Sequence, residues 1–193
     1  MNGLKKRKTL SLCFCGLFCA LFFVASNVIP AVQIVPGVPF TLQIFVIAFC
    51  AYLLGIKYSL LTYATICVLT LCGVPMMSGL SAGPAAFIKP SGGFIVGWIF
   101  VIIAAGIGRT VSKGIKNPIV TAAVSVIIGS VGVIFDYLFG AIWLSVSASS
   151  GIAGFYTSFV SSITAFFAFD VLKTALGYAA ALFIEKVLRI KKQ

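Results

Sequence analysis

The chain contains no histidine and only three acidic residues among its 193 residues. Histidine is the side chain most often used for proton transfer at neutral pH and a frequent zinc ligand. The nucleotide-binding pattern GxxxxGK[ST] is also missing from the sequence. These absences argue against an enzyme, a metal site and direct binding of ATP. Active uptake by such a chain would need energy from a partner or from an ion gradient.

Charged residues are scarce as well, at 9% of the sequence, whereas 61% of the residues are hydrophobic. A typical soluble domain has about 25% charged residues. The mean hydropathy is +1.19, and a soluble protein of this size has too little interior to bury so much apolar surface. The composition therefore predicts an integral membrane protein.

The cysteines all lie within apolar stretches, without a CxxC pair. We interpret them as small apolar filler rather than as disulfides or metal ligands.

The apolar stretches are long enough to predict six transmembrane helices, since one span needs roughly 20 apolar residues. The predicted helices cover residues 9–29, 41–56, 58–74, 91–111, 118–146 and 167–188. The basic start followed by an apolar run also fits a signal peptide, but the further apolar stretches favour a retained first helix. The sequence thus predicts an all-α integral membrane protein whose residues 1–193 form a single six-helix domain.

The net charge of +11 reports topology rather than a nucleic-acid partner, because the basic residues lie mostly at the ends of apolar segments. With the N-terminus inside, 12 of the 14 Lys and Arg residues fall on the cytoplasmic side, and only Lys89 and Lys173 do not. Both termini are therefore predicted to be cytoplasmic, in a multi-pass protein of a prokaryotic cytoplasmic membrane. The outer segments 30–40, 75–90 and 147–154 are rich in Gly, Pro and Ser. We expect them to fold over a pocket that opens on the extracellular side.

Two charged residues, Asp170 and Lys173, lie inside the last apolar run. Their spacing of three places them on one face of a helix. They form either an internal ion pair or a ligand clamp, and the cost of burying charge in a membrane favours the clamp. Asp136 lies in another apolar run and either faces the cavity or pairs with Lys89 or Lys173.

Neutral groups near the predicted outer ends supply further candidates. Thr41 and Gln43 either bind a ligand or cap a helix. The stretch "KPSGGF" places Ser91 at a helix start, where two glycines allow close backbone approach. The remaining candidates are Gly92 and Gly93 in that stretch, Phe94, and the aromatic residues Tyr137 and Trp143, which either line a pocket or lie in the interfacial belt.

Four segments resemble one family in their order and spacing: "VPFTLQ", "GVPMMSGLSAGPAAFIKPSGGFIVGW", "YLFGAIWL" and "FDVLK". Together they resemble BioY, the biotin-specific substrate-binding (S) component of energy-coupling factor (ECF) transporters. The resemblance covers residues 16–185. It departs from the usual family pattern in four places: Ser91 replaces a threonine, Phe94 replaces a tyrosine, Lys89 stands where glycine is usual, and "FAFD" opens the last helix where the family often has Pro-Gly-Asp.

The resemblance implies a high-affinity receptor for biotin, which is the transported ligand, with no other cofactor. It also implies a transmembrane coupling protein and two cytoplasmic ATPase subunits as partners. Gly16 and Ala20 match the family's small-residue docking pattern, although by themselves they indicate only helix packing. Asp170 would accept ureido N–H groups, whereas Lys173 would contact the valerate, the ureido carbonyl or Asp170.

Two other functions stay open at this point. The chain is either an S component for another vitamin, such as thiamine or riboflavin, or an ion-coupled secondary transporter with Asp136 and Asp170 as proton sites. No inverted repeat with broken helices is visible in the sequence, which disfavours the secondary transporter.

Overall fold

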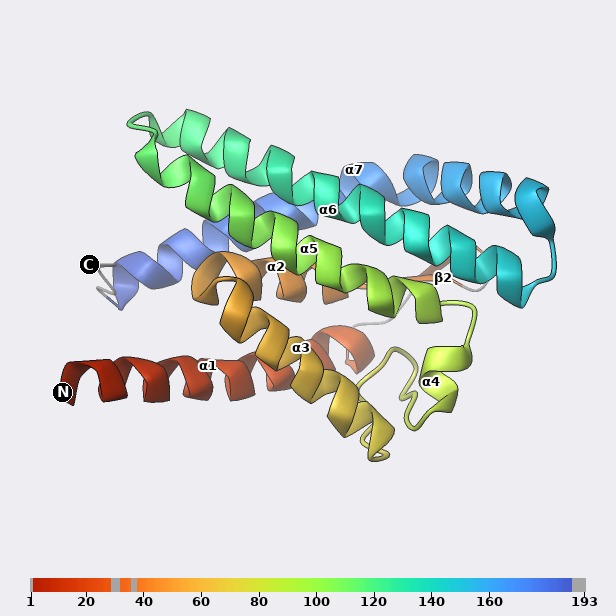
Figure 1. Cartoon of the computed structure of the whole chain (residues 1–193), viewed down its shortest axis with the longest axis horizontal. Coiled ribbons are helices and arrows are strands. Elements are labelled where there is room, and N and C mark those ends of the chain that lie inside the picture. Colours follow the sequence, from red (N-terminus) through yellow and green to blue (C-terminus); the bar gives the residue numbers. More distant parts are fainter. Residues whose placement is uncertain (1, 29–31, 36–37, 189–193) are drawn as a thin grey trace.

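The computed structural model describes residues 2–28, 32–35 and 38–188. Most of them are helical (Figure 1). The elements in chain order are α1 (Asn2–Asn27), β1 (Val32–Val35), β2 (Val38–Phe40), α2 (Gln43–Leu54), α3 (Ile56–Leu71), α4 (Ala85–Ile88), α5 (Gly92–Val111), the 3-10 turn η1 (Ser112–Gly114), α6 (Pro118–Ser147) and α7 (Gly151–Val187).

The helices α5 and α6 pack closely through glycines. A Cβ atom at Gly132 on α6 would lie only 2.6 Å from the backbone oxygen of Phe100 on α5. Glycine thus lets the two backbones approach in a way that no larger residue permits. The chain then returns along α6 as α7, and α2 lies between α5 and α7 (Figure 1).

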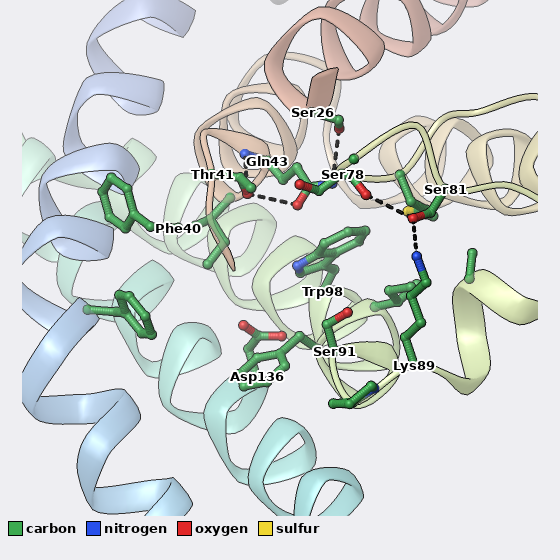
Figure 2. A pocket seen from close by; sticks show the side chains of 18 of the residues that line it. Ser26, Phe40, Thr41, Gln43, Ser78, Ser81, Lys89, Ser91, Trp98 and Asp136 are labelled. Carbon is green, nitrogen blue, oxygen red and sulfur yellow. Dashed lines mark hydrogen bonds between the residues drawn. The ribbon is translucent and has the colours of Figure 1, made fainter. Parts of the chain in front are cut away.

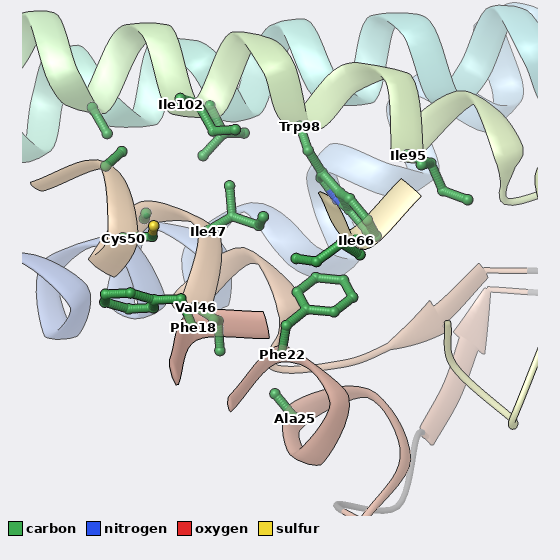
Figure 3. Packing of buried hydrophobic residues seen from close by; sticks show 14 of the residues in the cluster. Phe18, Phe22, Ala25, Val46, Ile47, Cys50, Ile66, Ile95, Trp98 and Ile102 are labelled. Atoms are coloured by element: carbon green, nitrogen blue, oxygen red, sulfur yellow. The ribbon is translucent and has the colours of Figure 1, made fainter. Parts of the chain in front are cut away.

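The apolar core lies where α1 and α2 meet α5. Figure 3 shows Phe22 of α1 directed toward Trp98 of α5, with α2 beside them. The two rings meet edge to face, with centroids 5.4 Å apart. Edge-to-face contact is a preferred geometry for aromatic pairs, so this pair holds α1 against α5.

Among the described residues, four helices are long and apolar enough to cross a membrane: the Lys8–Asn27 part of α1, α5 with η1, α6 and α7. The helices α2 and α3 are apolar but shorter, with 12 and 16 residues. Large side chains such as Ile119 (77% exposed) and Ile152 (88% exposed) lie on the outside of the bundle. An apolar exterior of this kind is typical of a helical membrane protein, which lipid surrounds.

The predicted outer segment 30–40 is not a plain loop. Where the structure describes it, the chain forms an antiparallel hairpin in which Val32 lies opposite Phe40 and Gln33 opposite Pro39. The segment is rich in valine, whose branched side chain favours extended backbone. The pairing of β1 with β2 therefore satisfies backbone N–H and C=O groups of this segment.

The last helix begins earlier than predicted, at Gly151 instead of 167, so a short turn replaces the expected outer loop at 147–154. Ser149 and Gly151 have positive φ angles of 52° and 60° in this turn. Within the helix, Thr157 donates a hydrogen bond to the oxygen of Ala153 (2.9 Å) and Ser162 to that of Ser158 (2.8 Å). Hydroxyls that bond back by one turn let Ser and Thr lie within a helix, so a loop-like composition is helical here.

The basic residues gather at one end of the bundle, where the two termini and the α2–α3 and α5–α6 connections lie (Figure 1). At this end Arg109 of α5 forms an ion pair with Glu185 of α7, with side chains 12% and 15% exposed. The ends of α5 and α7 thus enclose most of the Glu185 side chain. The other basic residues of these segments whose side chains the structure describes are Lys8, Lys57, Lys113, Lys116 and Lys186.

Candidate ligand-binding site

A cavity of about 610 Å³ lies in the half of the bundle away from the basic end. Its volume lies in the range of small-molecule sites, about 300–1,000 Å³. The ends of α1 and β2, the start of α2, the segment before α4, the α4–α5 turn, and the middle of α6 and α7 all contribute to its lining (Figure 2).

The predicted pair Asp170 and Lys173 lies in the wall of this cavity. The Lys173 ammonium donates a hydrogen bond to Asp170 Oδ1 at 2.8 Å, and the Tyr137 hydroxyl donates to Asp170 Oδ2. Lys173 Nζ also lies 3.7 Å from the centre of the Phe40 ring. All four residues line the cavity. The pair is thus both an internal ion pair and part of the cavity wall, and Asp170 has a donor on each oxygen.

Asp136 also lines the cavity, and its side chain is only 1% exposed. Neither carboxylate oxygen has a hydrogen-bond partner among the described residues. The predicted alternative of an ion pair with Lys89 or Lys173 is not found in the described part of the chain. The structure therefore places Asp136 at the cavity rather than in an interhelical ion pair.

Lys89 lies on the opposite side of the cavity from Asp136 (Figure 2). Its ammonium donates a hydrogen bond to Ser81 Oγ at 2.5 Å, and Ser81 Oγ donates in turn to the backbone oxygen of Ser78 at 2.9 Å. Lys89 is exposed, and no carboxylate among the described residues pairs with it. This side of the cavity therefore offers a positive charge and hydroxyl groups.

Thr41 and Gln43 form a chain of hydrogen bonds along the cavity wall (Figure 2). The Thr41 hydroxyl donates to Gln43 Oε1 at 2.8 Å, and Gln43 Nε2 donates to Ser26 Oγ at 3.0 Å. Asn27 accepts from the Leu80 N–H at 2.8 Å and donates to the oxygen of residue 75 at 3.0 Å. These bonds fix the end of α1 to the segments that border the cavity.

Of the candidates in and near the "KPSGGF" stretch, Ser91 and Phe94 line the cavity, whereas Gly92, Gly93 and Trp143 are not among its lining residues. A Cβ atom at Gly92 would lie 1.9 Å from the oxygen of Phe87, and one at Gly93 would lie 2.3 Å from Trp143 Cβ. The two glycines therefore serve the packing of α5 against α4 and α6. Trp143 is 38% exposed, and its indole N–H donates to the oxygen of Lys89 at 3.0 Å.

Several lining residues were not predicted from the sequence. Most are apolar or small and carry no signal that separates a cavity wall from a helix contact. They are Ser26, Asn27, Phe40, Ile44, Met77, Ser78, Gly79, Ser81, Ala86, Pro90, Ile95, Trp98 and Phe166.

The small residues Gly16 and Ala20 lie on the outer face of α1. Both are exposed, and a Cβ atom at Gly16 would meet no neighbouring atom within 4 Å. They therefore make no internal helix packing, which was the simplest expectation for such a pair.

The chain is similar to known proteins along nearly its whole length. A family model described as "BioY family" matches residues 2–190. The "Biotin transporter BioY" of Lactococcus lactis subsp. cremoris is 30% identical over 200 residues, which cover 100% of this chain and 95% of that protein. The protein of the same name from Rhizobium etli is 31% identical over 175 residues, covering 88% of this chain and 89% of the relative.

One solved structure has a similar fold, with a TM-score of 0.78 and 26% sequence identity. It is described as the S-component for biotin from an ECF-type ABC transporter, and the match covers 94% of this chain and 93% of that one.

Proposed function

The chain belongs to the BioY family, and from that premise we propose that it is the biotin-binding component of an ECF-type uptake transporter. It is a transport component and not an enzyme. The proposed role is to bind biotin on the outer side of the membrane and deliver it inward, with ATP hydrolysed by partner subunits.

The observation that carries the proposal is the distribution of polar groups in the cavity. Lys89 and two serines lie on one side of the cavity and Asp136 lies across from them (Figure 2). The Asp170–Lys173 pair is a further part of the lining, with the Lys173 ammonium against the Phe40 ring. The aromatic side chains between and around them are Phe40, Phe94, Trp98 and Phe166.

Biotin has matching groups in the same order: a ureido ring with two N–H donors and a carbonyl, an apolar thiophane ring, and a valerate carboxylate. Because Lys173 already pairs with Asp170, Lys89 is the cation left for the carboxylate. The ureido ring then lies near Asp170, Lys173 and Tyr137, with the aromatic residues against the thiophane ring.

The test is a calorimetric titration of the purified, detergent-solubilised protein with biotin, with thiamine and riboflavin as controls. Hydrogen bonds to charged groups contribute about 1.5–3 kcal/mol each, and a few of them with apolar burial support nanomolar binding, or about −12 kcal/mol. We expect biotin alone to bind. Absent biotin binding in a folded sample, or preference for another vitamin, would overturn the assignment.

The proposed topology has six spans, with the basic end in the cytoplasm of a prokaryotic cell and the cavity facing outward. Positive charge at one end of the bundle supports this orientation. At 1.5 Å per residue, the 12 residues of α2 reach roughly 18 Å, less than the ~30 Å hydrocarbon layer. We therefore place the hairpin of β1 and β2 within the outer part of the membrane region, above α2.

The proposed partners are a transmembrane coupling protein and two ATPase subunits. The exposed small residues Gly16 and Ala20 support a docking face on α1, because a flat helix surface admits close approach of a second helix. Gly16→Leu should abolish copurification with the coupling protein and leave biotin affinity unchanged. Retained copurification would place the docking face elsewhere.

A further inference from the structure

The cavity holds two buried carboxylates with very different surroundings. Asp170 receives one hydrogen bond on each oxygen, from Lys173 and from Tyr137. Asp136 receives none on either oxygen from the part of the chain that the structure describes. Its exposed fraction of 1% is as low as the 3% of Asp170, so burial alone does not distinguish them.

The carboxylate of Asp136 faces the cavity beneath Trp98, as Figure 2 shows. Across from it lies Gly97 of α5, where a Cβ atom would be 2.2 Å from Asp136 Oδ1. Any larger residue at 97 would therefore push the carboxylate out of this position. Close packing of α5 against α6 thus holds the carboxylate at the cavity, where no donor from the described residues reaches it.

Buried acceptors without a donor are uncommon in folded proteins, and each calls for a specific reason. A ligand N–H group supplies such a reason, because it would satisfy the carboxylate on binding. The carboxyl group keeps acceptor capacity in both its ionised and its protonated form, so this role does not depend on its protonation state.

We propose that Asp136 accepts a hydrogen bond from one ring N–H of the ureido group and thereby makes the site specific for ligands with a donor there. Each Asp170 oxygen has one donor and keeps capacity for a second hydrogen bond, so Asp136 is proposed as an acceptor in addition to Asp170. This inference rests on biotin as the ligand. Sites built to hydrogen-bond a ligand reject analogues that lack the matching group.

The test combines Asp136→Ala with biotin and with its two ring-nitrogen monomethyl derivatives, each titrated against the purified protein. For biotin we expect the substitution to weaken binding roughly 10- to 100-fold, the value of one charge-assisted hydrogen bond. For one methyl isomer, the loss of affinity seen in the unsubstituted protein should largely disappear in Asp136→Ala. The reason is that Asp136→Ala has room for the methyl group and no carboxylate whose hydrogen bond the methylation could remove. For the other methyl isomer, the loss of affinity relative to biotin should be the same in the unsubstituted protein and in Asp136→Ala.

Ser130→Ala is the matched control on the same helix. Ser130 is buried, and its hydroxyl donates to the oxygen of Val126 at 2.8 Å, outside the cavity lining. This variant should bind biotin as the unsubstituted protein does. Asp136→Asn, nearly the same size, checks that any loss is not caused by misfolding, together with thermal unfolding of each variant.

Unchanged biotin affinity in Asp136→Ala would overturn the inference. The inference would also fail if each methyl isomer lost the same affinity in Asp136→Ala as in the unsubstituted protein. These outcomes are distinct from failure of the proposed function, in which the unsubstituted protein would not bind biotin at all.

Discussion

Each half of the bundle contains an ion pair. The pair at the basic end joins two helices, whereas the pair beside the cavity lies within one helix. At the basic end, Arg109 and Glu185 tie α5 to α7, and Ser112 and Ser125 share a hydrogen bond of 2.6 Å nearby. At the other end, the Asp170–Lys173 pair borders a cavity of about 610 Å³. A buried ion pair therefore does not by itself indicate a ligand site. The adjacent cavity does.

The largest expected effect comes from Asp170→Asn, which removes the carboxylate charge at the cavity. Removing one partner of a buried ion pair lowers the free energy of unfolding by about 3–5 kcal/mol. Here the substitution also releases the Lys173 ammonium from its position in the cavity wall. We expect biotin affinity to fall roughly 100-fold or more, measured by calorimetry. Affinity within a factor of two of the unsubstituted protein would make the pair purely structural.

Glu185→Gln makes the same chemical change at the basic end and is the matched control. We expect it to lower the free energy of unfolding by about 1.5–3 kcal/mol, since it weakens a hydrogen bond between charged groups. Thermal unfolding in detergent should show a Tm several degrees lower, with biotin affinity unchanged. A large loss of affinity would show that the two ends are coupled and would break the comparison.

The smallest effect is expected for Lys89→Gln at the exposed side of the cavity. Exposed ion pairs contribute about 0.2–1 kcal/mol, so affinity should fall only about 1.5- to 5-fold. Charges at the edge of a site act mainly on association. Stopped-flow measurements should show slower binding and a weaker dependence on salt. Biotin methyl ester lacks the carboxylate charge, so Lys89→Gln should not change its affinity. An equal loss of affinity for the ester and for biotin would contradict the proposed contact between Lys89 and the carboxylate.

Much of the helical architecture could be predicted because long apolar runs leave few alternatives in a membrane. The start of α6 is one example: Asn117 caps it, accepting from the N–H of Ile119 at 2.9 Å, and Pro118 follows in the first turn. The start of α7 could not be predicted, because serines and threonines that bond within a helix look like a loop in the sequence.

The charged part of the cavity could be predicted for a physical reason, since charge in a membrane is costly and therefore informative. The aromatic residues that line the cavity could not be predicted. Phe40, Trp98 and Phe166 have the same residue types whether they face a ligand, another helix or lipid. Nor could the sequence indicate that Asp170 has donors on both oxygens whereas Asp136 has none among the described residues, because that depends on which helices meet.

The most direct test of the account is a structure of the protein with biotin bound. We predict that biotin occupies the cavity with its valerate carboxylate near Lys89 and its ureido ring between Asp136 and the Asp170–Lys173 pair. Biotin in the reverse orientation, or bound outside this cavity, would contradict the account.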